Sequence, residues 1–160
     1  MSKLIILRGN SGSGKTTVSK ILQEKFGRNT MLISHDMVRM QILHAKDAET
    51  LPLIMQLLKY GRQNSDITIL EGILPVEVYM PLFELAVQEY GKDIFPFYYD
   101  LPFEETLQRH ATKPNREDFG EQDMRRWWKE KDFIDIIPEK IITKNLSISD
   151  TVDMIYNLVA

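Results

Sequence analysis

The sequence has no cysteine, and this absence excludes disulfide bonds and thiolate metal sites. It also lacks any run of about 18 apolar residues, so no membrane span is predicted. The chain enters a predicted strand at residue 3 without the layout of a signal peptide. The formal net charge of −3 gives no general attraction to nucleic acid. We therefore expect a cytoplasmic protein, monomeric or homodimeric, that binds neither membranes nor nucleic acid.

The sequence also lacks internal repeats, low-complexity segments and linkers, so residues 1–160 are predicted to form one domain. Hydrophobic runs alternate between strand and helix patterns, which predicts an α/β fold with a mostly parallel sheet covered on both faces. Pro81 would occupy the first turn of its helix and Gly91 would follow the helix end. Strands are predicted at 3–8, 30–34, 66–70, 94–99 and 140–143. Helices are predicted at 15–26, 36–44, 50–63, 80–90, 103–111, 121–131 and 149–159.

The most specific motif is a phosphate-binding loop, G-x-x-x-x-G-K-[ST], between the first strand and the first helix. Its glycines allow the backbone to curl so that N–H groups face phosphate oxygens. Lys15 adds a positive charge for the β- and γ-phosphates, and the Thr16 hydroxyl is a ligand for Mg²⁺. The predicted ATP-binding residues here are Gly9, Asn10, Ser11, Gly12, Ser13, Gly14, Lys15, Thr16 and Thr17.

Ligands of parallel α/β sheets bind at the carboxyl ends of the strands, so residues there are candidates for chemistry. Asp36 follows the second strand, and its carboxylate is a candidate general base for an attacking hydroxyl. The alternative is that Asp36 only caps its helix. Arg39 lies one helical turn later, where it would hold a polar or anionic part of the acceptor.

Glu71 ends the third predicted strand and is the candidate for ordering Mg²⁺ or binding the acceptor. Asp100 is a rival metal-supporting acid because it also follows an apolar strand. A further alternative is that Glu71 is an ordinary acid in a surface turn. His35 is interpreted as a hydrogen-bonded structural histidine, and contact with the substrate is the alternative.

A short helical lid is predicted at about 109–126. Arg109 and Lys113 share one helix face, and Pro114 ends the helix. We expect Arg109 and Lys113 to bind ATP, and Arg116 to stabilise charge on the transferring phosphoryl group. The alternative is a solvated helix of mixed charge.

These motifs together resemble the small P-loop kinases of the nucleoside/nucleotide-kinase-like group, including zeta-toxin-like, chloramphenicol-phosphotransferase-like and uridine-kinase-like proteins. The resemblance rests on residues 9–17, 33–39, 69–74, 109–116 and 119–128. It implies a three-layer αβα P-loop NTPase fold with a five-stranded parallel sheet in the order 2-3-1-4-5. It also implies ATP and Mg²⁺, with Asp36 as base, Lys15 and lid arginine as charge stabilisers, Thr16 as metal ligand, and adenine near Arg109 and residues 144–147. Lys113 stands where the common lid pattern has a second arginine, and lysine cannot make the same two-pronged contact.

Other P-loop classes fit less well. A GTPase needs an Asn-Lys-x-Asp signature, and residues 143–146 lack its acid. We therefore predict an ATP-dependent kinase that phosphorylates a hydroxyl of a small molecule of nucleoside, sugar or antibiotic type. The alternatives are a regulatory P-loop ATPase with little transferase activity and a polynucleotide-end kinase. The sequence does not identify the acceptor.

Overall fold

The computed structural model describes residues 2–114 and 116–160, and these form a five-stranded sheet between two layers of helices. All strand pairs are parallel and the order is β2-β3-β1-β4-β5, as predicted. Asn115, which the predicted lid includes, lies outside the described residues. The strands are β1 (Lys3–Gly9), β2 (Thr30–Ser34), β3 (Ile67–Gly72), β4 (Ile94–Tyr99) and β5 (Lys140–Ile142).

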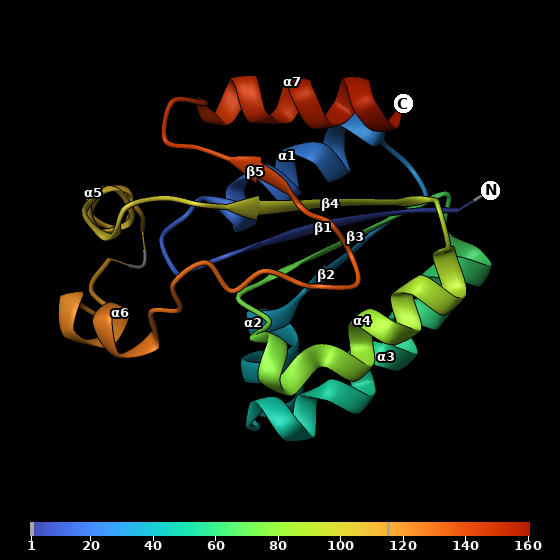
Figure 1. The fold of residues 1–160 in the computed structure, drawn as a ribbon, viewed down its shortest axis with the longest axis horizontal. Coiled ribbons are helices and arrows are strands. Elements are labelled where there is room, and N and C mark those ends of the chain that lie inside the picture. The colour runs from blue at the N-terminus through green and yellow to red at the C-terminus, as the bar shows by residue number, and fades with distance from the viewer. Residues whose placement is uncertain (1, 115) are drawn as a thin grey trace.

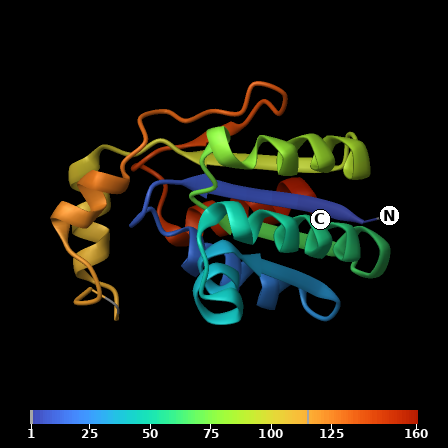
Figure 2. The ribbon, with the colours of Figure 1, turned by 90° about the horizontal axis from the view of Figure 1, so that it is seen from below.

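Two pairs of helices cover the two faces of the sheet (Figure 1). Helices α1 (Lys15–Phe26) and α7 (Ile148–Val159) lie on one face, and α3 (Asp47–Asn64) and α4 (Val76–Tyr90) lie on the other. Two shorter helices, α5 (Phe103–Ala111) and α6 (Glu121–Trp127), stand apart beyond the carboxyl ends of the strands (Figure 2). The structure thus has the three predicted layers and a helical element at the edge where ligands bind.

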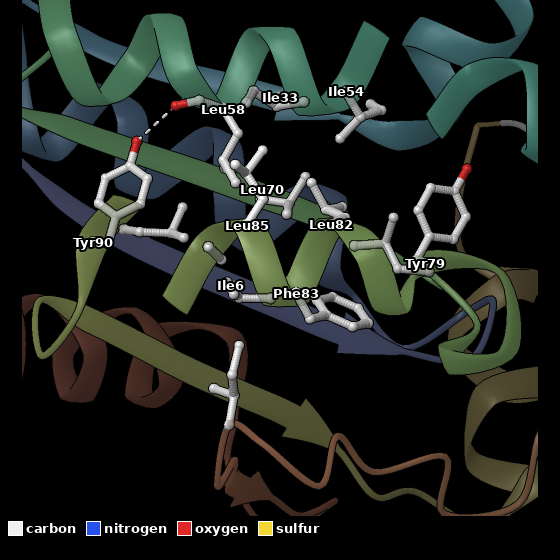
Figure 3. Packing of buried hydrophobic residues seen from close by; sticks show 14 of the residues in the cluster. Ile6, Ile33, Ile54, Leu58, Leu70, Tyr79, Leu82, Phe83, Leu85 and Tyr90 are labelled. Atoms are coloured by element: carbon white, nitrogen blue, oxygen red, sulfur yellow. Dashed lines mark hydrogen bonds between the residues drawn. The ribbon is translucent and has the colours of Figure 1, made fainter. Parts of the chain in front are cut away.

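The alternating direction of side chains along the central strand builds a core on each face. Leu4 and Ile6 of β1 belong to the cluster with α3 and α4, whereas Ile5 and Leu7 belong to the cluster with α1 and α7. In the first cluster the α4 side chains fill the space between β1 and α3 (Figure 3). The hydroxyl of Tyr90, at the end of α4, donates a hydrogen bond of 3.0 Å to the Leu58 carbonyl on α3.

Two predicted helix starts were wrong, and for α4 the reason is that Pro81 was taken to mark the first turn. Helix α4 begins at Val76 instead of residue 80, and α3 begins at Asp47 instead of residue 50. Pro81 and Pro52 therefore lie inside their helices. In α4 the carbonyl of Pro75 already accepts the first helical bonds, which leaves Pro81 five residues beyond the helix start.

The helix predicted at 36–44 is also different in the structure. It consists of one turn, α2 (His35–Met37), followed by a π-helix, η1 (Val38–Leu43), that ends at His44 with a φ of 50°. The helix predicted at 121–131 ends at Trp127. No helix of the described residues is both long and apolar enough to span a membrane.

Candidate active site

The phosphate-binding loop lines a cavity of about 90 Å³ at the start of α1. Residues 11–16 border this phosphate cavity, and Gly12 and Gly14 have φ values of 83° and 100°, which favour glycine. No side chain among the described residues caps α1. The first N–H groups of α1 are therefore available for an anion at the positive end of the helix.

Lys15 is buried beside this cavity, with 7% of its surface exposed. Its ammonium group donates a hydrogen bond of 2.9 Å to the carbonyl of Asn10. Burial lowers the pKa of Lys15 to about 8, although the carboxylates of Glu71 and Asp36 oppose this shift. A phosphate in the cavity would give this buried cation the counter-charge that it lacks, so Lys15 fits its predicted role in nucleotide binding.

Glu71 meets Thr16 at the rim of the phosphate cavity. One carboxylate oxygen of Glu71 accepts hydrogen bonds from the Thr16 hydroxyl at 3.0 Å and from the Ser34 hydroxyl at 2.6 Å. Among the described residues, no three His, Asp or Glu side chains are grouped to hold a metal by themselves. The pair still fits Mg²⁺, which takes few protein ligands and completes its shell with phosphates and water. The rival Asp100 instead pairs with Lys131 at 2.6 Å.

Asp36 lies where the phosphate cavity meets a second cavity of about 860 Å³. It stands inside α2, whose N-cap is Ser34, so the interpretation of Asp36 as a helix cap was wrong. Interaction with His35 holds the pKa of Asp36 below its usual value, and Lys15 and Arg39 add to this effect. The Asp36 carboxylate is therefore ionised at neutral pH, as a proton acceptor must be.

His35 is buried, as predicted for a structural histidine, and it also borders the second cavity. Its Nδ1 lies 3.5 Å from the carboxylate of Asp36, and its Nε2 forms a hydrogen bond with the Tyr79 hydroxyl. Because β3 passes close behind the ring, a Cβ atom at Gly72 would lie 2.6 Å from the Cβ of His35. The glycine thus allows the sheet to support the His35–Asp36 pair.

Arg39 borders the larger cavity, which we call the acceptor cavity because Asp36 and Arg39, the residues predicted to contact an acceptor, line it. Its Nε lies 3.8 Å from the carboxylate of Asp47 at the start of α3. The start of α4, residues 118–119 and the end of α6 form further walls. The structure therefore brings Asp36 and Arg39 together, as the sequence predicts, and adds walls from three distant segments.

The predicted lid residues divide into two groups. Arg109 donates a hydrogen bond of 2.6 Å to the Ser13 carbonyl of the loop, and Lys113 borders the phosphate cavity, where burial lowers its pKa. Arg116 is exposed, bonds the Lys113 carbonyl at 3.2 Å, and borders neither of the two cavities formed by the described residues. The structure therefore does not bring Arg116 to the site.

Three of the residues within 9–17 that were predicted to bind ATP do not line the phosphate cavity. Gly9 ends β1, where an added Cβ atom would lie 2.8 Å from the Cβ of Tyr99. Thr17 is exposed on α1. Asn10 turns its side chain away from the phosphate cavity, toward the segment that follows α6.

The contact that Asn10 makes was not predicted. Its amide nitrogen donates to the Lys129 carbonyl and its amide oxygen accepts from the Lys129 N–H, both at 2.7 Å. Lys129 also borders the acceptor cavity. One side chain therefore joins the phosphate-binding loop to a wall of the acceptor cavity, and we call this contact the Asn10 clamp.

A buried ion cluster beneath the loop was also missed. Arg8, fully buried in β1, bonds both carboxylate oxygens of Glu139 at 2.9–3.0 Å and the carboxylate of Asp132 at 3.0 Å. Its guanidinium lies over the rings of Phe83 and Tyr98. Arg8 directly follows four apolar residues of β1, and this was the available signal, since a buried cation needs partners.

Comparison with known proteins gives the same fold. The Zeta toxin family model matches residues 2–68, which is less than half of the chain. No curated protein sequence gives a match.

Several similar solved structures cover nearly the whole chain, among them the following three. The APS kinase of Mycobacterium tuberculosis, in complex with AMPPNP and APS, is 18% identical, with a TM-score of 0.71 over 99% of this chain and 97% of that one. The tunicamycin resistance protein of Deinococcus radiodurans is 17% identical, with a TM-score of 0.67 over 100% and 96%. Shikimate kinase of Acinetobacter baumannii, in complex with shikimate, is 20% identical, with a TM-score of 0.62 over 99% and 93%. The chain has the fold of the P-loop small-molecule kinases.

Proposed function

We propose that the protein transfers the γ-phosphoryl group of ATP to a hydroxyl group of a small molecule of nucleoside, sugar or antibiotic type. The observation that carries this proposal is the place of Asp36, whose carboxylate borders both the phosphate cavity and the acceptor cavity. A hydroxyl in the acceptor cavity and a phosphate in the loop would therefore meet at one ionised base.

The reaction follows from this placement. The acceptor oxygen forms a bond to the γ-phosphorus, the bond from that phosphorus to the bridging oxygen of ADP breaks, and Asp36 takes the hydroxyl proton. Lys15 and Lys113 lie beside the phosphate cavity, where their charges stabilise the transferring group. Arg109 supports the loop through its hydrogen bond to the Ser13 carbonyl.

Thr16 and Glu71 are the residues that would hold Mg²⁺. When bound, Mg²⁺ neutralises charge on the β- and γ-phosphates. The hydroxyl of Ser34 fixes the Glu71 carboxylate in position through its bond of 2.6 Å.

The test is a screen of small hydroxyl compounds with ATP, read by the mass of the product, followed by variants. Asp36→Asn should lower the transfer rate by about 10²–10⁴-fold because the base is lost. Its affinity for the ATP analogue AMPPNP should stay close to the parental value. Asp100→Asn is the matched control, since Asp100 also follows a strand but pairs with Lys131.

Two results would contradict this proposal. An Asp36→Asn protein that transfers at the parental rate would remove the general base. ATP hydrolysis without any phosphorylated product across the screen would favour a regulatory ATPase instead.

A further inference from the structure

The acceptor cavity is large and has an aromatic wall. Its volume of about 860 Å³ lies within the range of about 300–1,000 Å³ that is typical of sites for drug-sized ligands. Trp127 at the end of α6 borders it with 40% of its surface exposed, and its ring meets the Phe119 ring edge-on at 5.1 Å. Met40, Ile73 and Val78 border the same cavity. This wall offers apolar and π-surface to a planar group.

The charges around the acceptor cavity balance. Among the residues that the structure describes, four acidic and four basic side chains border it. Three of the four basic side chains already have a carboxylate partner. These ion pairs are Arg39–Asp47 at 3.8 Å, Lys129–Glu77 at 2.8 Å and Arg126–Asp123 at 2.6 Å.

Electrostatic repulsion would oppose the binding of an anionic acceptor in the acceptor cavity. Its charge would lie near the carboxylates of Asp36 and Asp118, which border the same cavity, and near the phosphates of the donor. The fourth basic residue, Lys46, is exposed and has no ion pair with any described residue, so it offers one solvated charge at the rim. A site for a carboxylate or phosphate group normally presents free arginine or lysine side chains instead.

We infer that the acceptor is an uncharged, hydroxyl-bearing compound with a planar group that packs on Trp127, rather than a sugar acid or a phosphorylated compound. This inference rests on the proposed function, because it takes the cavity beside Asp36 as the acceptor site. It restricts the acceptor to compounds that are uncharged and that carry a planar group.

Binding of matched compounds to the AMPPNP-saturated protein tests this inference without requiring transfer. The first series is 4-nitrophenyl β-glucoside, methyl β-glucoside and 4-nitrophenyl β-glucuronide, and the second is uridine, ribose and uridine monophosphate. In each series the first compound is uncharged and planar, the second lacks the planar group, and the third is anionic. We expect the first compound to bind at least tenfold more tightly than the other two in one series or both.

Three outcomes of the binding series would overturn the inference. The first is that the anionic compound binds as tightly as its uncharged counterpart in both series. The second is that the planar group adds no affinity. The third is that neither uncharged planar compound binds.

Substitutions of residues that border the acceptor cavity test which side chains the compounds contact. Trp127→Ala should weaken binding of the uncharged planar compound at least tenfold. Trp128→Ala is the matched control, because its ring packs on Phe103 at 5.4 Å and does not border the acceptor cavity formed by the described residues. Glu77→Gln should raise affinity for the anionic compounds by releasing Lys129. Equal effects of the two tryptophan substitutions would overturn the inference.

The outcomes separate this inference from the proposed function. Phosphorylated product from anionic compounds alone would overturn the acceptor class and leave the kinase proposal standing. Tight binding of an uncharged planar compound at Trp127 without any transfer, in the presence of ATP and Mg²⁺, would uphold the binding preference and contradict the kinase proposal.

Discussion

The pH dependence of nucleotide binding follows from the burial of Lys15. Burial lowers the pKa of its ammonium group from an ordinary value of 10.5 to about 8 in the free protein. Phosphates in the adjacent cavity favour the charged form, so binding raises this pKa again. At pH 9 about nine in ten free molecules carry a neutral Lys15, and binding must then take up a proton. Affinity should therefore fall about tenfold between pH 7 and pH 9, or about 1.4 kcal/mol.

Isothermal titration with AMPPNP between pH 7 and pH 9.5 measures this effect. Repeating the titration at pH 9 in two buffers of different ionisation heat counts the protons that are taken up, and we expect close to one. Lys15→Met should bind more weakly and show a smaller dependence, to which Lys113 beside the same cavity would contribute, whereas Lys20→Met, at an exposed position of α1, should behave as the parent. A parental affinity that is constant over this range, or an equal fall in Lys15→Met, would refute the reasoning.

Two further predictions concern the support of the loop. Arg8→Met leaves the buried Glu139 carboxylate without its cation and should lower the free energy of unfolding in urea by about 3–5 kcal/mol. The double variant Arg8→Met with Glu139→Gln should recover part of that loss. Equal stability of the single and double variants would contradict this prediction. Gly12→Ala places a Cβ atom 2.5 Å from the Thr106 carbonyl oxygen and should weaken AMPPNP binding, whereas Gly27→Ala, with a similar φ of 88° and open space, should only lower stability. Equal AMPPNP affinities of these two variants would argue against close packing of α5 on the loop.

The parts of the fold that could be predicted are those set by neighbouring residues. The bounds of α1, β2 and β4 were predicted correctly because apolar spacing and glycine positions define them locally. The sheet order followed from the resemblance of the motifs to P-loop kinases. The starts of α3 and α4 could not be predicted, because tertiary packing tolerates Pro52 and Pro81 inside these helices.

The site divides in the same way. The positions of Lys15, Thr16 and Asp36 follow from the motif and from the rule that strand ends meet at one edge of the sheet. The position of Arg116 was not predicted, because it follows the end of α5 and no local pattern places its side chain. The partner of Asn10 lies 119 residues away, and periodicity and spacing along the chain do not reveal such a contact.

Under the proposed function, the Asn10 clamp would connect the binding of the nucleotide with the binding of the acceptor. The carbonyl of Asn10 accepts from Lys15, while its side chain holds Lys129 in the acceptor wall. A nucleotide that draws Lys15 toward its phosphates would change the conformation of the phosphate-binding loop, to which Lys129 in this wall is bonded. An acceptor that orders the wall would in turn restrict the conformation of the loop. Such a linkage is reciprocal, so each substrate would change the affinity of the other by the same factor.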